Sequence, residues 1–208
     1  VFSSFGCEVT MLVRGNTLIS KEDLSIRERF NKVFQEKVDL RFEATVSKVR
    51  QGSNGIRLNF EDETLDVLEV DELLLATGRL PDLDSLKIRA ANIATADGYI
   101  VTDQYMRTTA DNIWALGDVT NPAQLKHTAN AEAKIVSHNL INKKLIKVDL
   151  DPTPHAIFSN PQVASVGYTE QDAKAAEMQY VVAVEEYGDV AYGWAMEEKT
   201  GICKVIAD

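Results

Sequence analysis

The first fifty residues follow the order strand, helix, strand, and this pattern restricts the fold of the chain more than any other. Residues 8–13 are rich in apolar and β-branched side chains and come directly after Gly6, which can end a preceding helix. Residues 21–37 carry apolar side chains at helical spacing, and residues 40–49 alternate in the manner of a strand. We therefore predict a βαβ unit and an α/β fold.

A hairpin and a buried strand are predicted next along the chain. Turn-forming residues 51–55 separate residues 40–49 from residues 56–60, which we expect to pair back as a hairpin. Residues 67–76 are apolar enough for a buried central strand. The Gly and Pro of residues 77–81 break this pattern and mark the passage to a second unit.

Further elements are predicted in the second half of the chain. Residues 99–101 and 113–116 resemble short strands, residues 124–142 an amphipathic helix, and the prolines and acids of residues 149–154 a linker. A small α+β unit follows, with strands at residues 157–158, 163–166, 181–186 and 202–206 and a helix at residues 170–177.

Composition excludes several classes of partner. The net charge of −10 argues against nucleic acid or an anionic membrane surface as the main partner, because phosphate binding needs concentrated Lys and Arg. The longest apolar runs, such as residues 73–76, are too short to cross a bilayer. Cys7 and Cys203 are the two cysteines, and we expect two buried structural thiols in a reducing, cytoplasmic compartment. The three histidines and two cysteines show no metal-ligand spacing.

Residues 114–119, Trp-Ala-Leu-Gly-Asp-Val, are the sharpest candidate for a ligand site. We expect Asp118 to lie at the carboxyl end of a strand, where open α/β sheets bind ligands. A carboxylate there can accept hydrogen bonds from the hydroxyl groups of a nucleotide or sugar alcohol. Leu125, Lys126 and His127 come next, at the start of a helix whose N–H groups and dipole suit an electron-rich ring such as a reduced flavin. His127 taken alone is better explained as an ordinary polar residue of a first helical turn.

Arg14 directly follows the first predicted strand. In a dinucleotide-binding fold an acid at the end of the second strand binds the ribose hydroxyls of NAD, whereas an Arg there accommodates the 2′-phosphate of NADP. The alternative is a solvated arginine after a strand. The glycine-rich loop that would support a dinucleotide site is not in the sequence, and the turn at Gly78 and Arg79 is a weak signal by itself.

Three segments together resemble the flavin-dependent pyridine nucleotide–disulfide oxidoreductases, the class of glutathione reductase, lipoamide dehydrogenase and mercuric reductase. These segments are residues 75–81 (Leu-Ala-Thr-Gly-Arg-Leu-Pro), residues 115–119 and residues 158–170 (Phe-Ser-Asn-Pro-Gln-Val-Ala-Ser-Val-Gly-Tyr-Thr-Glu). Residues 125–133 and 187–197 are most similar to the mycothione reductase branch, which reduces a low-molecular-weight disulfide with NADPH.

The resemblance implies a cofactor role for particular residues. For FAD, Asp118 binds the ribityl chain, Gly117 allows close approach, the backbone around Leu125, Lys126 and His127 faces the flavin, and Arg79 lies at the site. For NADPH, Arg14 holds the 2′-phosphate, and Val46 and Gly78 lie near the dinucleotide. A second basic residue often follows in relatives, and that position falls near Ser20, with Lys21 beside it.

The resemblance also implies a domain plan and a partner. Residues 1–78 are expected to form an N-terminally truncated, Rossmann-like NAD(P)-binding domain, and residues 79–148 the second part of an FAD-binding domain. Residues 149–208 are expected to begin an α+β dimerisation domain. The parent enzyme is expected to be a homodimer acting on a small disulfide.

The chain departs from the family where the chemistry takes place. The family's redox-active Cys-x4-Cys pair and its catalytic His–Glu pair have no counterpart in this sequence, and Cys7 and Cys203 cannot replace the former. We therefore expect an inactive fragment with no catalytic residue. Two alternatives stay open: a lipoamide dehydrogenase or mercuric reductase of the same class, and a non-catalytic nucleotide-binding module. Arg14 argues against the NAD-using lipoamide enzymes.

Overall fold

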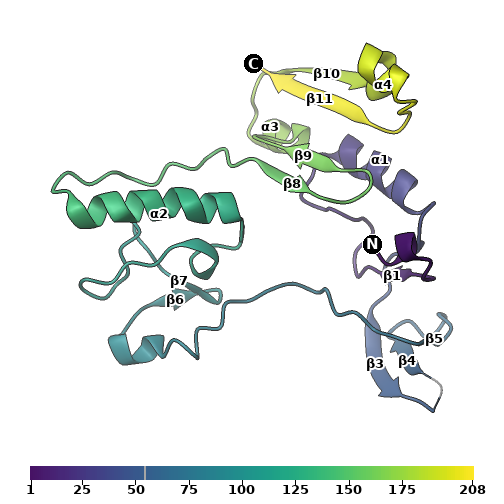
Figure 1. Ribbon diagram of the computed structural model, residues 1–208, viewed down its shortest axis with the longest axis horizontal. Coiled ribbons are helices and arrows are strands. Elements are labelled where there is room, and N and C mark those ends of the chain that lie inside the picture. The colour runs from purple at the N-terminus through teal and green to yellow at the C-terminus, as the bar shows by residue number, and fades with distance from the viewer. Residues whose placement is uncertain (54) are drawn as a thin grey trace. The chain divides into compact units, whose positions relative to one another are not determined.

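The computed structural model describes residues 1–53 and 55–208, which form two compact units (Figure 1). One unit combines Val1–Leu75 with Ala156–Asp208, and the other is Ala76–His155. The mixed α/β architecture agrees with the predicted fold class.

The first unit begins with the predicted βαβ motif. A 3-10 turn, Ser3–Phe5, ends at Gly6, whose φ of 89° is readily adopted only by glycine. Strand β1 (Thr10–Leu12) pairs in parallel with strand β2 (Asp39–Arg41), and helix α1 (Leu24–Phe34) connects them in sequence. The predicted strand at residues 40–49 is wrong in its extent, because residues 42–45 bend away before a separate strand, β3, begins.

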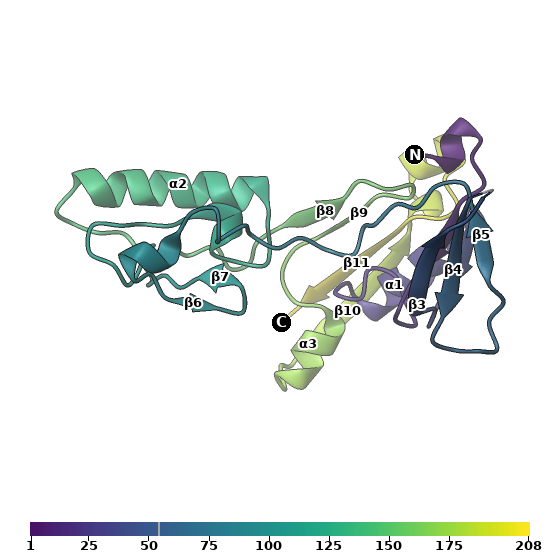
Figure 2. The ribbon, with the colours of Figure 1, turned by 90° about the horizontal axis from the view of Figure 1, so that it is seen from below.

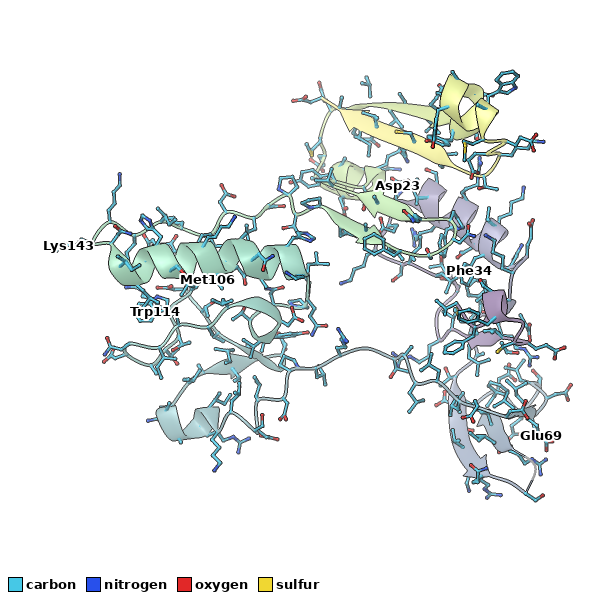
Figure 3. The ribbon with its side chains drawn as sticks, viewed as in Figure 1. Asp23, Phe34, Glu69, Met106, Trp114 and Lys143 are labelled. Atoms are coloured by element: carbon cyan, nitrogen blue, oxygen red, sulfur yellow. The ribbon has the colours of Figure 1, made fainter. Side chains whose placement is uncertain are left out.

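Helix α1 forms because its sequence caps one end and buries one face. Asp23 is the N-cap, and its carboxylate accepts a hydrogen bond from the backbone N–H of Ser25. Phe30 and Val33 are buried, and the ring of Phe34 stacks on that of Phe30 with 5.2 Å between centroids (Phe34 is labelled in Figure 3). The helix is therefore a fixed support for the segments that pack on it.

A three-stranded antiparallel sheet follows, in the order β3 (Val46–Gln51), β4 (Ile56–Phe60) and β5 (Leu68–Val70). The predicted hairpin is confirmed, and Leu58 and Phe60 of its second strand are buried. The predicted central strand at residues 67–76 is wrong. Only β5 pairs, while Leu74 and Leu75 are 71% and 75% exposed, so their apolar character does not correspond to burial here.

The rest of the first unit contains two strand pairs and two short helices. Strand β8 (His155–Ile157) pairs with β9 (Val163–Ser165), and β10 (Val181–Glu186) pairs antiparallel with β11 (Ile202–Ala207). Helix α3 (Glu170–Ala175) lies between β9 and β10 in sequence. A 3-10 turn at Tyr187–Asp189 and helix α4 (Ala191–Ala195) lie between β10 and β11. Thr169 and Asp172 form a capping box that starts α3.

A buried ion cluster joins the two stretches of the first unit at the start of α1. The ammonium of Lys204 donates to Asp23 Oδ1 at 2.7 Å, to Glu170 Oε2 at 2.5 Å and to Ser25 Oγ at 2.9 Å. The side chains of Lys204 and Asp23 are only 7% and 10% exposed (Asp23 is labelled in Figure 3). Burial alone would raise the pKa of Asp23, but hydrogen bonds from Lys204, the Glu170 N–H and Ser25 outweigh it and lower that pKa to about 2.

The second unit is organised around helix α2 (Lys126–Ile141), which packs on the 3-10 turn at Gly117–Val119 (Figure 1 and Figure 2). A hairpin in the same unit joins β6 (Thr95–Ala96) to β7 (Tyr99–Ile100), and a 3-10 turn at Ile88–Ala91 precedes it. The buried residues of α2 lie on one face and are Thr128, Glu132, Val136 and Asn139. The Asn139 amide donates to the Tyr105 and Ile146 carbonyls and accepts from the Ile146 N–H, which fixes the chain near buried Met106 (Figure 3).

One predicted strand of the second unit does not form. Residues 113–116 make a single isolated bridge, between Trp114 and Arg107, instead of a ladder (Trp114 is labelled in Figure 3). Among the described residues, no helix combines the length and the hydropathy that crossing a membrane requires.

Candidate functional site

The predicted ligand segment contains a tight turn that is anchored to α2. Gly117 begins the 3-10 turn η3 (Gly117–Val119) with φ of +76°, and its backbone N–H donates to Glu132 Oε2 at 2.6 Å. A Cβ on residue 117 would lie 3.3 Å from Ala129 Cβ. Glycine is therefore required here both by the backbone conformation and by the close approach of the helix.

Asp118 is exposed at the second position of this turn. The prediction that it ends a strand is wrong, because residues 113–116 lack the ladder partners of a strand and the chain turns at Gly117. The turn is closed by Thr120, whose N–H and hydroxyl both donate to the Gly117 carbonyl, at 2.9 and 2.8 Å. The Asp118 carboxylate is thus presented to solvent from a backbone that is held on both sides.

Glu132 is the residue that the sequence analysis left without a role. Its side chain is buried, and besides Gly117 it accepts a hydrogen bond from the Asn121 amide at 3.2 Å. The available signal was a carboxylate on the same helical face as Thr128 and Val136, four residues to either side. A charged group on a buried face needs partners, and here the partners are both ends of the turn that carries Asp118.

The N-terminus of α2 follows the turn and has no side-chain cap. Its N-cap, Leu125, is extended and supplies no capping oxygen, so the N–H groups of the first turn lack an intrahelical partner. Lys126 and His127 are exposed in that turn, and His127 Nε2 donates to the Pro154 carbonyl at 2.7 Å. The hydroxyl of Thr128 is buried and has no hydrogen-bond partner among the described residues.

Arg79 and Gly78 belong to the same unit as this turn. The Arg79 carbonyl accepts a weak hydrogen bond, at 3.5 Å, from the Gln124 amide, which directly precedes Leu125. Gly78 has φ of +130° and has open space around the position of a Cβ. The structure therefore brings Arg79 to the chain that enters α2.

These groups fit the flavin cofactor that the resemblance implies. Asp118 offers an acceptor to ligand hydroxyls, while the uncapped first turn of α2 offers backbone donors and a positive dipole to an electron-rich ring edge. The buried, unpartnered Thr128 hydroxyl adds a polar group at the same helix end. A ligand with a polyol chain and a carbonyl-bearing ring has the complementary groups.

Arg14 lies in the first unit, at the end of β1, on a fixed backbone. The Val13 N–H donates to the Arg41 carbonyl at 2.9 Å, and the Ala44 and Glu43 N–H groups donate to the Val13 and Gly15 carbonyls, both at 3.0 Å. Val46 begins β3 two residues after Ala44. Arg14 and Val46 therefore belong to one hydrogen-bonded group of segments, whereas Gly78, the third predicted NADPH residue, belongs to the second unit.

The two cysteines differ from expectation. Both Cys7 and Cys203 are free and exposed, so the prediction that they are buried thiols is wrong. Cys7 follows the Gly6 turn, and Cys203 lies on β11, one of the two strands of the β10–β11 sheet. Among the described residues, no three His, Cys, Asp or Glu side chains are grouped closely enough to hold a metal ion.

Comparison with known proteins gives a consistent result. Residues 1–134 match the model of the pyridine nucleotide-disulphide oxidoreductases, and residues 153–208 match that of their dimerisation domain. The chain is 40% identical over its whole length to a mycothione reductase of Mycobacterium tuberculosis and 33% identical to a mercuric reductase of Bacillus cereus. Among solved structures it resembles the HOCl-induced flavoprotein disulfide reductase RclA of Escherichia coli, with a TM-score of 0.90 and 30% identity over the whole chain.

The chain spans about half the length of two of these proteins, 46% of the mycothione reductase and 48% of RclA. It spans 33% of the mercuric reductase. The family match nevertheless extends over more than half of the chain and includes both the Gly117 turn and the Arg14 segment. This chain belongs to the pyridine nucleotide-disulphide oxidoreductase family.

Proposed function

We propose that this chain forms part of an FAD- and NADPH-dependent reductase that acts on a small disulfide. The observation that carries the proposal is the Gly117 turn, which is tied to buried Glu132 and presents Asp118 just before the uncapped N-terminus of α2. Bound FAD would supply the chemistry of transferring two electrons from NADPH toward a disulfide.

The residues of the chain have separate tasks in this proposal. Asp118 would accept hydrogen bonds from the ribityl hydroxyls, and Gly117 would let the backbone approach the cofactor. The first turn of α2, at Leu125, Lys126 and His127, would offer N–H groups and its positive dipole end to the electron-rich edge of the flavin ring. The bond from His127 to the Pro154 carbonyl holds its imidazole with the proton on Nε2, so this ring orients the entry to the helix.

NADPH is proposed as the reductant because Arg14 follows β1 of the parallel pair. A guanidinium can make a bidentate contact with a phosphate, which an acid at this position would repel. Val46 and Gly78 are proposed to lie near the bound dinucleotide, and Arg79 near the flavin.

The proposed substrate is the disulfide of mycothiol. Its support is the identity of 40% with a mycothione reductase, against 33% with a mercuric reductase and 28% with a dihydrolipoyl dehydrogenase of Staphylococcus aureus.

The match of residues 153–208 to the dimerisation domain supports a homodimer. We also propose that the enzyme is cytoplasmic. We propose further that the 208 residues alone do not turn over substrate, because they lack the family's Cys-x4-Cys pair.

A substrate panel tests this proposal. The protein is purified at its natural length, and the oxidation of NADPH and NADH is followed with mycothione, lipoamide, glutathione disulfide and mercuric ion. We expect mycothione with NADPH to give the highest kcat/KM. Faster turnover of lipoamide with NADH, or of mercuric ion, would assign the chain to the other branch, and no turnover of any pair would favour a non-catalytic nucleotide-binding module.

A further inference from the structure

The segment between β1 and α1, residues 14–21, is held at its middle by the side-chain amide of Asn31. We call it the 14–21 loop. Asn31 of α1 accepts a hydrogen bond from the Leu18 N–H at 3.1 Å through Oδ1 and donates to the Thr17 hydroxyl at 2.8 Å through Nδ2. Both polar ends of this side chain are therefore used on consecutive residues of the loop.

The loop needs such support because its backbone is unfavourable. Ile19 has φ of 44°, and a β-branched residue rarely adopts positive φ. The turn continues with a hydrogen bond of 2.9 Å from the Glu22 N–H to the Ile19 carbonyl. A conformation of this kind persists only where the surroundings determine it, and Asn31 contacts the two residues that directly precede Ile19.

Asn31 is itself on a rigid support. Its neighbours Phe30 and Val33 are buried, and the start of α1 is fixed by the Asp23–Lys204 pair. At the other end of the loop, the Gly15 carbonyl accepts from the Glu43 N–H. Arg14 and Lys21 are exposed at the two ends of a loop that is held at Gly15 and again at residues 17–18.

We infer that Asn31 is a positioning residue for cofactor selectivity: its amide holds the 14–21 loop so that Arg14, with Lys21 at the far end, is preorganised for the 2′-phosphate of NADPH. This inference rests on the proposed function, which gives Arg14 its ligand. Asn31 touches neither cofactor nor substrate, and it acts through the loop. A cation on an ordered loop binds a phosphate more tightly, because binding does not incur the entropy cost of ordering the loop.

The contribution of Asn31 to nucleotide binding is expected for NADPH and not for NADH. NADH lacks the 2′-phosphate, so its binding does not use the Arg14 contact and does not depend on the order of the loop. Loss of the Asn31 amide should therefore raise KM for NADPH while leaving kcat and the NADH parameters unchanged, which is the pattern of a lost binding interaction. A general loss of structure would instead affect both nucleotides.

The test is the ratio of kcat/KM for NADPH to that for NADH, measured on the protein at its natural length. We expect Asn31→Ala to lower this ratio about tenfold, through KM for NADPH. Gln35→Ala is the matched control, since it removes an exposed amide at the C-cap of the same helix, and it should leave the ratio within about twofold. Thr17→Val removes the partner hydroxyl while keeping the Leu18 bond, and it should lower the ratio by a smaller factor; it also decides the question if Asn31→Ala does not fold.

Arg14→Ala distinguishes a failure of the NADPH assignment from a failure of the role given to Asn31. If Arg14→Ala leaves the ratio at its wild-type value, the assignment of NADPH to this loop is wrong. If Arg14→Ala lowers the ratio but Asn31→Ala and Thr17→Val do not, the NADPH assignment stands and the role of Asn31 is overturned. An equal loss for NADPH and NADH in Asn31→Ala also overturns it.

Discussion

The carboxylate of Glu132 accepts a hydrogen bond of 2.6 Å from the backbone N–H of Gly117, across a helix-to-turn contact that is buried on both sides. Its second oxygen accepts from Asn121, so one side chain holds both ends of the turn that exposes Asp118. The position of Asp118, the carboxylate proposed to bind flavin, therefore depends on Glu132, whose side chain is buried.

Replacing Glu132 should weaken both the fold and the cofactor site. Glu132→Ala leaves the buried Gly117 N–H without an acceptor, which costs about 1–3 kcal/mol. Glu132→Gln keeps one acceptor oxygen and should lose less. Unfolding free energy and FAD content per chain measure the two effects, with exposed Asn130→Ala on the same helix as control. Full FAD content in Glu132→Ala would contradict the role given to this contact.

Gly117→Ala should reduce flavin binding more than an equally strained substitution elsewhere. Positive φ disfavours alanine at both Gly117 and Gly98, by about 1–3 kcal/mol. Only at Gly117 does the new Cβ meet a close neighbour, Ala129 at 3.3 Å; at Gly98 the nearest atom, of Leu80, is 3.8 Å away. We expect Gly117→Ala to lose FAD and Gly98→Ala to retain it at wild-type occupancy, and equal losses would refute the local argument.

Breaking the ion cluster at Lys204 should destabilise the protein in a pH-dependent way. Lys204→Met leaves the buried Asp23 carboxylate without its cation, at a cost of about 3 kcal/mol near pH 7. The folded pKa of Asp23, about 2, lies below its unfolded value, so its stabilising contribution is complete above about pH 4 and is lost as pH falls toward 2. The penalty of Lys204→Met should therefore shrink over that interval.

Urea unfolding between pH 2 and 7 measures this penalty. Lys174→Met, at an exposed position of α3, is the control and should change stability by less than about 0.5 kcal/mol at any pH in the range. A penalty for Lys204→Met that stays constant from pH 7 to pH 2 would show that Asp23 is not the group that Lys204 stabilises.

Local patterns in the sequence predicted the elements whose partners are close in sequence. The hairpin of β3 and β4 is specified by the turn residues between its strands, and α2 by its own periodicity and length. The βαβ order at the start was predicted because a helix between two strands is the usual crossover that joins parallel neighbours.

Predictions that needed distant partners failed. Residues 113–116 and 73–76 are apolar, but a strand also requires a ladder partner, which the sequence pattern does not supply. Asp23 and Lys204 are 181 residues apart, and Glu132 meets Gly117 only because α2 folds back on the turn. The sequence therefore identified Asp118, the candidate ligand, but not Glu132, the residue that positions it.

The central claim, that the Gly117 turn is part of a flavin site, is tested most directly by the FAD content of Asp118→Ala. Asp118 is exposed, so its removal should leave the unfolding midpoint of the FAD-free protein unchanged. We expect wild-type protein of natural length to bind about one FAD per chain, by analogy with the family site, and Asp118→Ala to bind FAD at least tenfold more weakly. The matched control is Asp111→Ala, another exposed carboxylate of the same unit, with wild-type affinity expected. Wild-type FAD affinity in Asp118→Ala, or a wild-type protein that binds no flavin, would contradict the claim.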